Sequence, residues 1–244
     1  MIPRSLLIFG ASLASTVFAY ATELFIVNPG FEDPVTPAAT FSGTNNAAPP
    51  GWSISDASSG LQDYRYYGVW NPEGTNSYIN GAPEGDNVGV VFLINNFNST
   101  PGGLQQTLGD TLQLSTEYRL TVQVGNFAPS GSEFNFAGFP GYRVELLAGG
   151  VVIASDNNTL SIGEGVFATS TVTYTSGTTD ARAGQALGIR LMNLNFSSTS
   201  PNNASGIEVN FDDVHLISTA VPEPSALALV GLAGLTVWGL RRRR

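Results

Sequence analysis

The chain of 244 residues has no cysteine, no lysine and a single histidine. Without cysteine, disulfide crosslinks and thiol chemistry are excluded, and cysteine usage says nothing about the compartment. Only 12% of the residues are charged, and the formal net charge is −9. The domain between the termini holds few arginines and nearly all the acidic residues, so it would repel duplex nucleic acid, and we expect no nucleic-acid partner.

The N-terminus has the pattern of a secretory signal peptide. Arg4 precedes an apolar run from Leu6 to Phe18, and Ala19-Tyr20-Ala21 follows with small residues at its first and third positions. This order matches the basic region, apolar region and cleavage site of a signal peptide, so residues 1–21 are predicted to be removed after Ala21. The alternative is a retained N-terminal anchor, which so short a run disfavours.

The C-terminus, residues 221–244, combines three features in a fixed order. Pro222-Glu223-Pro224 is followed by an uncharged stretch from Ser225 to Leu240 and then by Arg241 to Arg244. As a helix, the uncharged stretch would reach roughly 24 Å, somewhat less than a hydrocarbon core of about 30 Å. The arginines would stay on the cytoplasmic side, which leaves the preceding domain outside.

This arrangement resembles the PEP-CTERM sorting signal of Gram-negative bacteria. The resemblance implies an exosortase as partner, a precursor anchored in the inner membrane by the C-terminal helix, and a final place at the cell surface or outside the cell. The two prolines exclude a helix at this point and present an extended strip to a protease. The alternative is an ordinary tail anchor behind a proline linker.

Residues 22–220 read as one all-β domain. Strands are predicted at Leu24–Val27, Trp52–Ser55, Val88–Ile94, Tyr118–Gly125, Tyr142–Leu147, Val151–Ser155, Phe167–Tyr174, Leu187–Met192 and Ile207–Ile217. Gly149-Gly150 predicts a tight hairpin turn, and Thr36 to Pro50 a long surface loop. Many short strands bury apolar faces only by stacking sheets, so we predict a β-sandwich of the jelly-roll type.

Three short segments add detail to that fold: Asn28-Pro29-Gly30-Phe31-Glu32-Asp33, Pro50-Gly51-Trp52 and Phe211-Asp212-Asp213-Val214. They resemble the galactose-binding-like jelly roll of carbohydrate-binding modules. The resemblance implies that the first and last strands are neighbours and hold a structural Ca²⁺, with Glu32 and Asp213 as ligands. Asp33 and Asp212 replace them if the register differs by one. The alternative is that these carboxylates are merely solvated.

Aromatic residues mark a candidate binding surface. Tyr66, Tyr67 and Trp70 lie among polar side chains, and aromatic faces can stack on a sugar ring while polar neighbours bond its hydroxyls. We take these three as candidate carbohydrate-binding residues, the alternative being that such rings fill the sandwich core. The phenylalanine-rich segment Phe127 to Tyr142 is a second candidate, better suited to protein contact or to the core.

No catalytic constellation is visible in the sequence. His215 lies inside the last apolar strand, and the pairs Glu32-Asp33 and Asp212-Asp213 point to opposite faces of their strands. We therefore expect a non-catalytic surface or extracellular-matrix protein that binds carbohydrate or exopolysaccharide. The alternative is a structural matrix protein that makes only protein–protein contacts.

Overall fold

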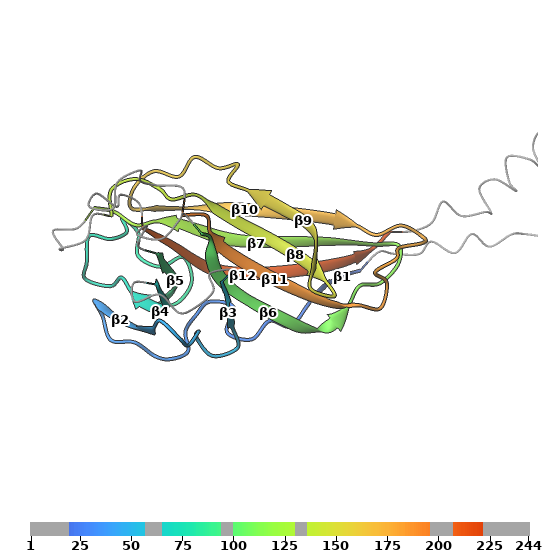
Figure 1. The fold of residues 1–244 in the computed structure, drawn as a ribbon, viewed down its shortest axis with the longest axis horizontal. Coiled ribbons are helices and arrows are strands. Elements are labelled where there is room, and N and C mark those ends of the chain that lie inside the picture. The colour runs from blue at the N-terminus through green and yellow to red at the C-terminus, as the bar shows by residue number, and fades with distance from the viewer. Residues whose placement is uncertain (1–19, 57–64, 94–99, 130–135, 196–206, 222–244) are drawn as a thin grey trace, which may run out of the picture.

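The protein is a sandwich of two antiparallel β-sheets, shown in Figure 1 as a computed structural model. The structure describes residues 20–56, 65–93, 100–129, 136–195 and 207–221. Within these ranges every regular element is a strand, so the all-β sandwich predicted from the sequence is confirmed.

The first sheet has the order β10-β7-β12-β5-β4-β2, with β1 attached to β12. Its strands are β1 (Ala21–Glu23), β2 (Thr40–Thr44), β4 (Arg65–Asn71), β5 (Val88–Leu93), β7 (Thr116–Asn126), β10 (Val166–Thr175) and β12 (Glu208–Ala220). The second sheet has the order β3-β6-β11-β8-β9. Its strands are β3 (Ser53–Asp56), β6 (Gly102–Thr111), β8 (Tyr142–Ala148), β9 (Val151–Asn157) and β11 (Ala186–Asn193).

The hydrophobic core lies between the two sheets. Successive side chains of a strand point to opposite faces, so Tyr67 and Val69 of β4 enter the core, whereas Tyr66 and Trp70 lie on the outer face. Leu191 of β11 meets this core from the second sheet and is 0% exposed. Burying a side chain of that size contributes roughly 1.5–3 kcal/mol to the stability of the folded state, so the core holds the two sheets together.

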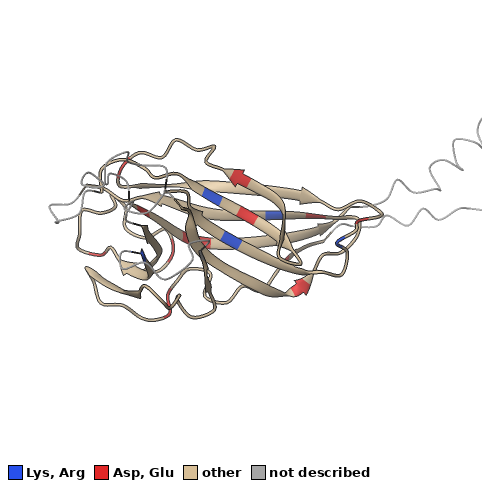
Figure 2. Ribbon diagram, in the orientation of Figure 1, with Lys and Arg blue, Asp and Glu red and all other residues tan. Residues whose placement is uncertain are grey.

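Charged residues are few on both sheets, as Figure 2 shows. On the outer face of the second sheet, Glu145 of β8 is buried between two arginines. Its Oε1 lies 2.5 Å from Arg143 Nε, and its Oε2 bonds Arg190 of β11. The two arginines therefore compensate the charge of this buried carboxylate.

The two ends of the domain lie side by side. Strand β1 pairs with β12 in a register that runs from Ala21 opposite Thr219 to Glu23 opposite Ile217. The predicted adjacency of the first and last strands is therefore confirmed. Both ends of the described chain leave the sandwich at the same end of its long axis (Figure 1).

The hairpin predicted at Gly149-Gly150 is confirmed, since both glycines have positive φ angles, 60° and 76°, between β8 and β9. Four strands were not predicted, β1 among them. Strand β6 begins with two glycines that resemble a turn, β4 was interpreted as a ligand-binding surface, and β2 lies inside the predicted loop Thr36 to Pro50 with all its residues exposed. The predicted strand Leu24–Val27 is irregular, and β1 precedes it.

Among the described residues, no helix is long and apolar enough to cross a membrane. The predicted signal peptide up to residue 19 and the predicted anchor, including Pro222-Glu223-Pro224, lie outside the described residues.

Candidate active site

The outer face of the first sheet carries a row of three side chains from three neighbouring strands. Glu208 of β12 lies opposite Phe92 of β5, and Phe92 lies opposite Tyr66 of β4. Directly opposed residues share a face, with Cβ atoms about 5 Å apart. The register therefore places one carboxyl group beside two aromatic rings.

Further rings join this row and form what we call the aromatic cluster. Its members are Tyr66, Trp70, Tyr78, Phe92, Phe127, Phe136 and Phe167. The ring centroid of Phe92 lies 5.8 Å from that of Tyr66 and 6.1 Å from that of Phe136. The centroid of Phe127 lies 4.6 Å from Phe136 and 6.2 Å from Trp70. Tilted pairs at these distances are favourable, so the cluster is a cohesive apolar surface beside Glu208.

A glycine of β7 makes room for two of these rings. Gly125 pairs with Asn210 of β12 on one side and with Phe167 of β10 on the other. A Cβ atom at Gly125 would lie 2.5 Å from Phe167 Cε1 and 2.7 Å from the Tyr78 hydroxyl oxygen. The missing side chain therefore lets Tyr78 and Phe167 meet over this strand, with ring centroids 4.3 Å apart.

Glu208 is the acidic group of this surface and is almost completely buried, with 7% of the residue exposed. Its Oε1 accepts a hydrogen bond from Asn210 Nδ2 at 2.9 Å. Removal from water disfavours the carboxylate more than this bond favours it, so burial raises the pKa of Glu208 to about 7. At neutral pH the group exists with and without its proton, as a general acid or base must.

Two neutral residues extend the contact made by Glu208. The Tyr78 hydroxyl donates a hydrogen bond to Asn210 Oδ1, and Asn210 Nδ2 also donates to the Gly89 carbonyl at 3.2 Å. Burial, followed by the charges of Glu208 and Asp212, holds the pKa of Tyr78 well above its usual value. Tyr78 therefore keeps its proton at neutral pH.

Trp70 adds a hydrogen-bond donor that is not used within the described part of the chain. Its Nε1 is buried and has no acceptor there. A buried donor without a partner costs about 1–3 kcal/mol. A bound molecule that carried an acceptor would recover this energy.

The structure separates the three residues predicted to bind carbohydrate. Tyr66 and Trp70 belong to the aromatic cluster, but Tyr67 points into the core and is 1% exposed. The three side chains do not form one platform because neighbouring positions of a strand alternate in direction. Phe127 and Phe136, from the second predicted segment, join Tyr66 and Trp70 instead.

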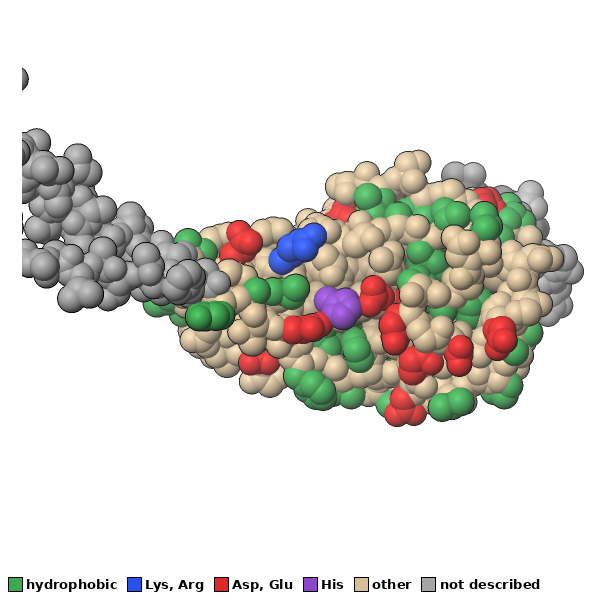
Figure 3. All heavy atoms as spheres, turned by 180° about the vertical axis from the view of Figure 1, so that it is seen from behind, with side chains coloured by type: hydrophobic (Ala, Val, Ile, Leu, Met, Phe, Trp, Pro, Cys, Tyr) green, Lys and Arg blue, Asp and Glu red, His purple; other side chains and the backbone are tan. Residues whose placement is uncertain are grey.

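A separate acidic pocket of about 530 Å³ lies where the first loop meets the bulge of β12. The ionisable residues that line it are Glu32, Asp33, Glu84, Asp213 and His215. Figure 3 shows the histidine on this face with acidic side chains on both sides. Both predicted calcium ligands, Glu32 and Asp213, thus reach the same pocket.

Backbone hydrogen bonds already engage some of the oxygen atoms of the predicted calcium ligands. Ca²⁺ prefers oxygen ligands, but Glu32 Oε1 already accepts two backbone N–H groups, at 3.0 and 2.8 Å. The substitute ligand Asp212 is buried and accepts two backbone N–H groups, at 2.9 and 2.8 Å, and burial raises its pKa to about 8. Among the residues that the structure describes, no three His, Asp or Glu side chains form a group that could hold a metal ion. The calcium ion stays a prediction.

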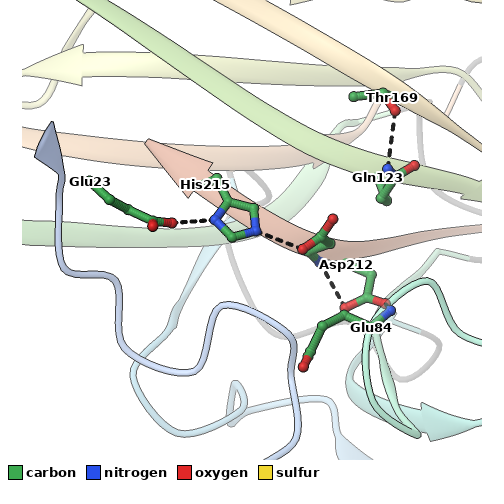
Figure 4. Close-up of polar contacts among 7 residues, drawn as sticks. Glu23, Glu84, Gln123, Thr169, Asp212 and His215 are labelled. Atoms are coloured by element: carbon green, nitrogen blue, oxygen red, sulfur yellow. Dashed lines mark hydrogen bonds and ion pairs between the residues drawn. The ribbon is translucent and has the colours of Figure 1, made fainter. Parts of the chain in front are cut away.

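His215 is held between two carboxylates. Its Nδ1 bonds Glu23 of β1, as Figure 4 shows, and its Nε2 lies 2.7 Å from Asp213 Oδ1. The register between β12 and β7 shifts from Asp212 to His215, and Asp213 has a positive φ of 50°. Glu23, and then Asp213, raise the pKa of His215 against the opposing effect of burial. The histidine therefore connects β1 to β12 rather than packing in the core.

The sequence profile of the HpiC1-like family, described as HpiC1 cyclase, matches residues 22–217. The chain therefore belongs to this family of cyclases. The profile of the PEP-CTERM protein-sorting motif matches residues 220–244, which confirms the predicted sorting signal and identifies an exported protein sorted by an exosortase. No curated protein matches the chain.

Solved structures of cyclases from Fischerella share this sandwich. The Stig cyclase FisC from Fischerella sp. TAU, bound to (3Z)-3-(1-methyl-2-pyrrolidinylidene)-3H-indole, is 37% identical with a TM-score of 0.74, and the match covers 83% of this chain and 100% of that one. A cyclase from Fischerella sp. TAU bound to 4-(1H-indol-3-yl)butan-2-one is 37% identical with a TM-score of 0.71, at the same coverage. An apo cyclase from Fischerella sp. is 36% identical with a TM-score of 0.73, covering 83% and 98%.

These matches correct the expected function. The prediction of a non-catalytic carbohydrate-binding protein, and its alternative of a structural matrix protein, are both wrong, because the family and its solved members are cyclases. The sequence argument looked for a histidine or for a carboxylate pair. Glu208 is neither, and in Ile207-Glu208-Val209-Asn210-Phe211 it resembles a solvent-facing residue of an alternating strand. Only the rings of other strands and loops reveal that this face is buried.

Proposed function

We propose that this protein is a cyclase that closes a ring in an apolar, aromatic substrate, with Glu208 as the proton donor. The observation that supports this proposal is the buried carboxyl group beside the aromatic cluster, whose pKa is raised to about 7. A general acid works best when its pKa lies near the working pH. Membership of the cyclase family supports the same reaction class.

The proposed reaction is balanced without a co-reactant. Glu208 gives its proton to the substrate, which becomes a cation, and an electron pair of the same molecule closes the ring. The cyclised cation then loses a proton to the Glu208 carboxylate, which restores the acid. The product is an isomer of the substrate, so nothing is oxidised or reduced.

The aromatic cluster would stabilise the cation formed between the two proton transfers. The negative face of an aromatic ring attracts a cation, with about 2 kcal/mol or more where water is excluded. Phe92 and Tyr66 are the rings in register with Glu208, and Phe136 lies beside Phe92. A charge that develops next to Glu208 would therefore form beside ring faces rather than in water.

An indole with a side chain at its 3-position is the substrate class that we propose. The solved cyclases hold two such molecules, one of them with a ketone in its side chain. The apolar character of the aromatic cluster suits an indole ring, and the unpaired Nε1 of Trp70 suits one polar acceptor on the ligand.

Export places this activity outside the cytoplasm. We propose that the domain is first held in the inner membrane by residues 225–240 and is then released or transferred by cleavage near Pro222-Glu223-Pro224. The uncharged span is marginal for a permanent anchor, since about 20 residues are usual. The enzyme would then work at the surface, in the surroundings of exported polysaccharide.

The test compares wild-type protein with the Glu208→Gln variant on 3-substituted indoles that carry an alkene in the side chain. Wild type is expected to form a product of unchanged mass with a new retention time, and the variant to lose at least about 100-fold in rate. Binding of 4-(1H-indol-3-yl)butan-2-one, measured by calorimetry, controls for an intact site and should be similar in both. Full turnover by Glu208→Gln would contradict the assignment of the acid.

A further inference from the structure

The side-chain amide of Asn210 can adopt only one of its two flipped orientations. It is 0% exposed, and its amide contacts Glu208, Gly89 and Tyr78. The Gly89 carbonyl can only accept a hydrogen bond, so the nitrogen of the amide must face it, at 3.2 Å. The oxygen of the amide must then face Tyr78, whose hydroxyl is left to donate.

The same orientation decides how Glu208 is bonded. The nitrogen that faces Gly89 also reaches Glu208 Oε1 at 2.9 Å, and this oxygen must therefore accept. In a protonated carboxyl group the carbonyl oxygen is the better acceptor, and the hydroxyl oxygen carries the proton. When Glu208 is protonated, Oε1 is thus the carbonyl oxygen.

We propose that Tyr78 and Asn210 are positioning residues that keep the transferable proton of Glu208 on Oε2. This proposal rests on the function proposed above, in which Glu208 is the acid. The hydrogen bond from Tyr78 fixes the orientation of the Asn210 amide, and this amide donates to Glu208 Oε1. Oε1 is therefore bonded to the protein, and Oε2 carries the proton that goes to the substrate. Tyr78 itself is excluded as the donor to substrate because its only proton is committed to Asn210.

Few other ionisable groups face Glu208 from the elements packed around it. On its own strand, Asp212 lies on the same face, and β4 contributes Tyr66. Strand β5 contributes Val90 and Phe92 on this face, which do not titrate. A change in the titration of Glu208 after substitution of a neutral partner would therefore report the hydrogen bonds themselves.

The experiment follows the protonation of Glu208 in the absence of substrate. The carboxylic acid C=O stretch is recorded by infrared difference spectroscopy between about pH 5 and pH 9 on the full-length protein, and the band that vanishes in Glu208→Gln is assigned to this residue. Asn210→Leu removes the donor to Oε1, so the carboxylate loses a stabilising bond, and the midpoint should rise by about one pH unit. Tyr78→Phe should move it in the same direction by less, since the amide stays but is no longer held.

A second way of disturbing Tyr78 keeps every hydrogen-bonding group. Gly125→Ala places a methyl group 2.7 Å from the Tyr78 hydroxyl oxygen and must displace it, so the midpoint should rise as in Tyr78→Phe. Tyr118→Phe is the control, because it removes the hydroxyl of another buried tyrosine, which accepts from the Gln113 N–H, and should leave the midpoint unchanged.

The outcomes distinguish this inference from the proposed function. An unchanged midpoint in Asn210→Leu would overturn the inference, and an unchanged midpoint in both Tyr78→Phe and Gly125→Ala would remove Tyr78 from it. Both results are independent of turnover. If Glu208→Gln kept full activity, the proposed function would fail even where the midpoints move as expected. Where both hold, the alkaline limb of the pH–rate profile, where Glu208 loses its proton, should shift in step with the infrared midpoint.

Discussion

Glu208 and Asn210 are two residues apart on β12, and the amide of Asn210 donates a 2.9 Å hydrogen bond to Glu208 Oε1. Both side chains leave the strand on its outer face, where the aromatic cluster buries them. A strand that pairs with β5 and β7 fixes the direction of its side chains, so the acid and its amide partner leave the backbone at fixed positions on the same face.

Stability should depend on the protonation of Glu208. Its pKa rises from 4.5 to about 7 on folding, so between these values the folded protein binds more protons than the unfolded chain. The stabilisation by the protonated group is complete below about pH 4.5 and is lost as the pH rises through about 7, a change on the order of 3 kcal/mol. Urea unfolding at several pH values should show this decline in wild type and a flatter curve in Glu208→Gln. The exposed Glu117→Gln is the control, and an identical decline in Glu208→Gln would contradict the prediction.

Calcium is expected to stabilise the domain through Glu32 and Asp213, which line one acidic pocket. A bound ion stabilises the folded state by mass action, so the Tm should fall on addition of EDTA and recover with Ca²⁺. Asp213→Ala should have a Tm that does not respond to the chelator, while Glu117→Gln should respond as wild type does. An identical Tm of wild type with and without EDTA would contradict the prediction that the pocket binds calcium.

The ion pair of His215 with Glu23 is expected to make a small, pH-dependent contribution. The side chains are 45% and 60% exposed, so the pair is screened by water and worth about 0.5 kcal/mol. Because the pKa of His215 is raised, the contribution is present below its unfolded value of 6.5 and is lost as the pH rises through the folded value. A double-mutant cycle with Glu23→Gln and His215→Asn should show coupling at about pH 6 and none at about pH 9. Coupling that persists at the higher pH would mean that packing joins β1 to β12.

Trp70 should matter for ligand binding more than for folding. Trp70→Phe keeps a ring beside Phe127 and removes the buried Nε1 donor, so the Tm should change little. Calorimetric affinity for 4-(1H-indol-3-yl)butan-2-one, which carries a ketone acceptor, should fall about tenfold, corresponding to one lost hydrogen bond. Equal affinity in both proteins would show that Trp70 contributes only its ring surface. Tyr67→Phe provides a comparison on the same strand, on the face that enters the core.

The C-terminus of the mature surface protein shows whether the sorting anchor has been removed. If the anchor is removed at Pro222-Glu223-Pro224, mass spectrometry of the surface form should detect no peptide from Arg241 to Arg244. Replacement of Glu223 by Ala should leave the anchored precursor in the membrane, because a protease that recognises the motif loses part of it. An intact arginine tail on the surface form of wild type would instead indicate a permanent tail anchor.

Much of the architecture could be predicted from local patterns. Alternating residues such as Leu120, Val122 and Val124 identify β7, and two glycines identify the turn between β8 and β9. These signals depend only on near neighbours along the chain. Strand β6 escaped prediction because Gly102, Gly103 and several polar residues hide its alternation, although its apolar positions are buried.

The sequence by itself determined the C-terminal sorting motif and the β-sandwich, because each depends on residues adjacent in the chain or on strand periodicity. The N-terminal signal peptide stays a prediction from the same kind of local pattern. The tertiary structure alone decided which face of the last strand is a site. Glu208 has the same neighbours in sequence whether water or aromatic rings cover it, and its pKa depends on that cover. Strands β4, β5 and β7 bring residues from positions 66 to 127 to within reach of position 208, and this burial turns an ordinary glutamate of an alternating strand into a candidate acid.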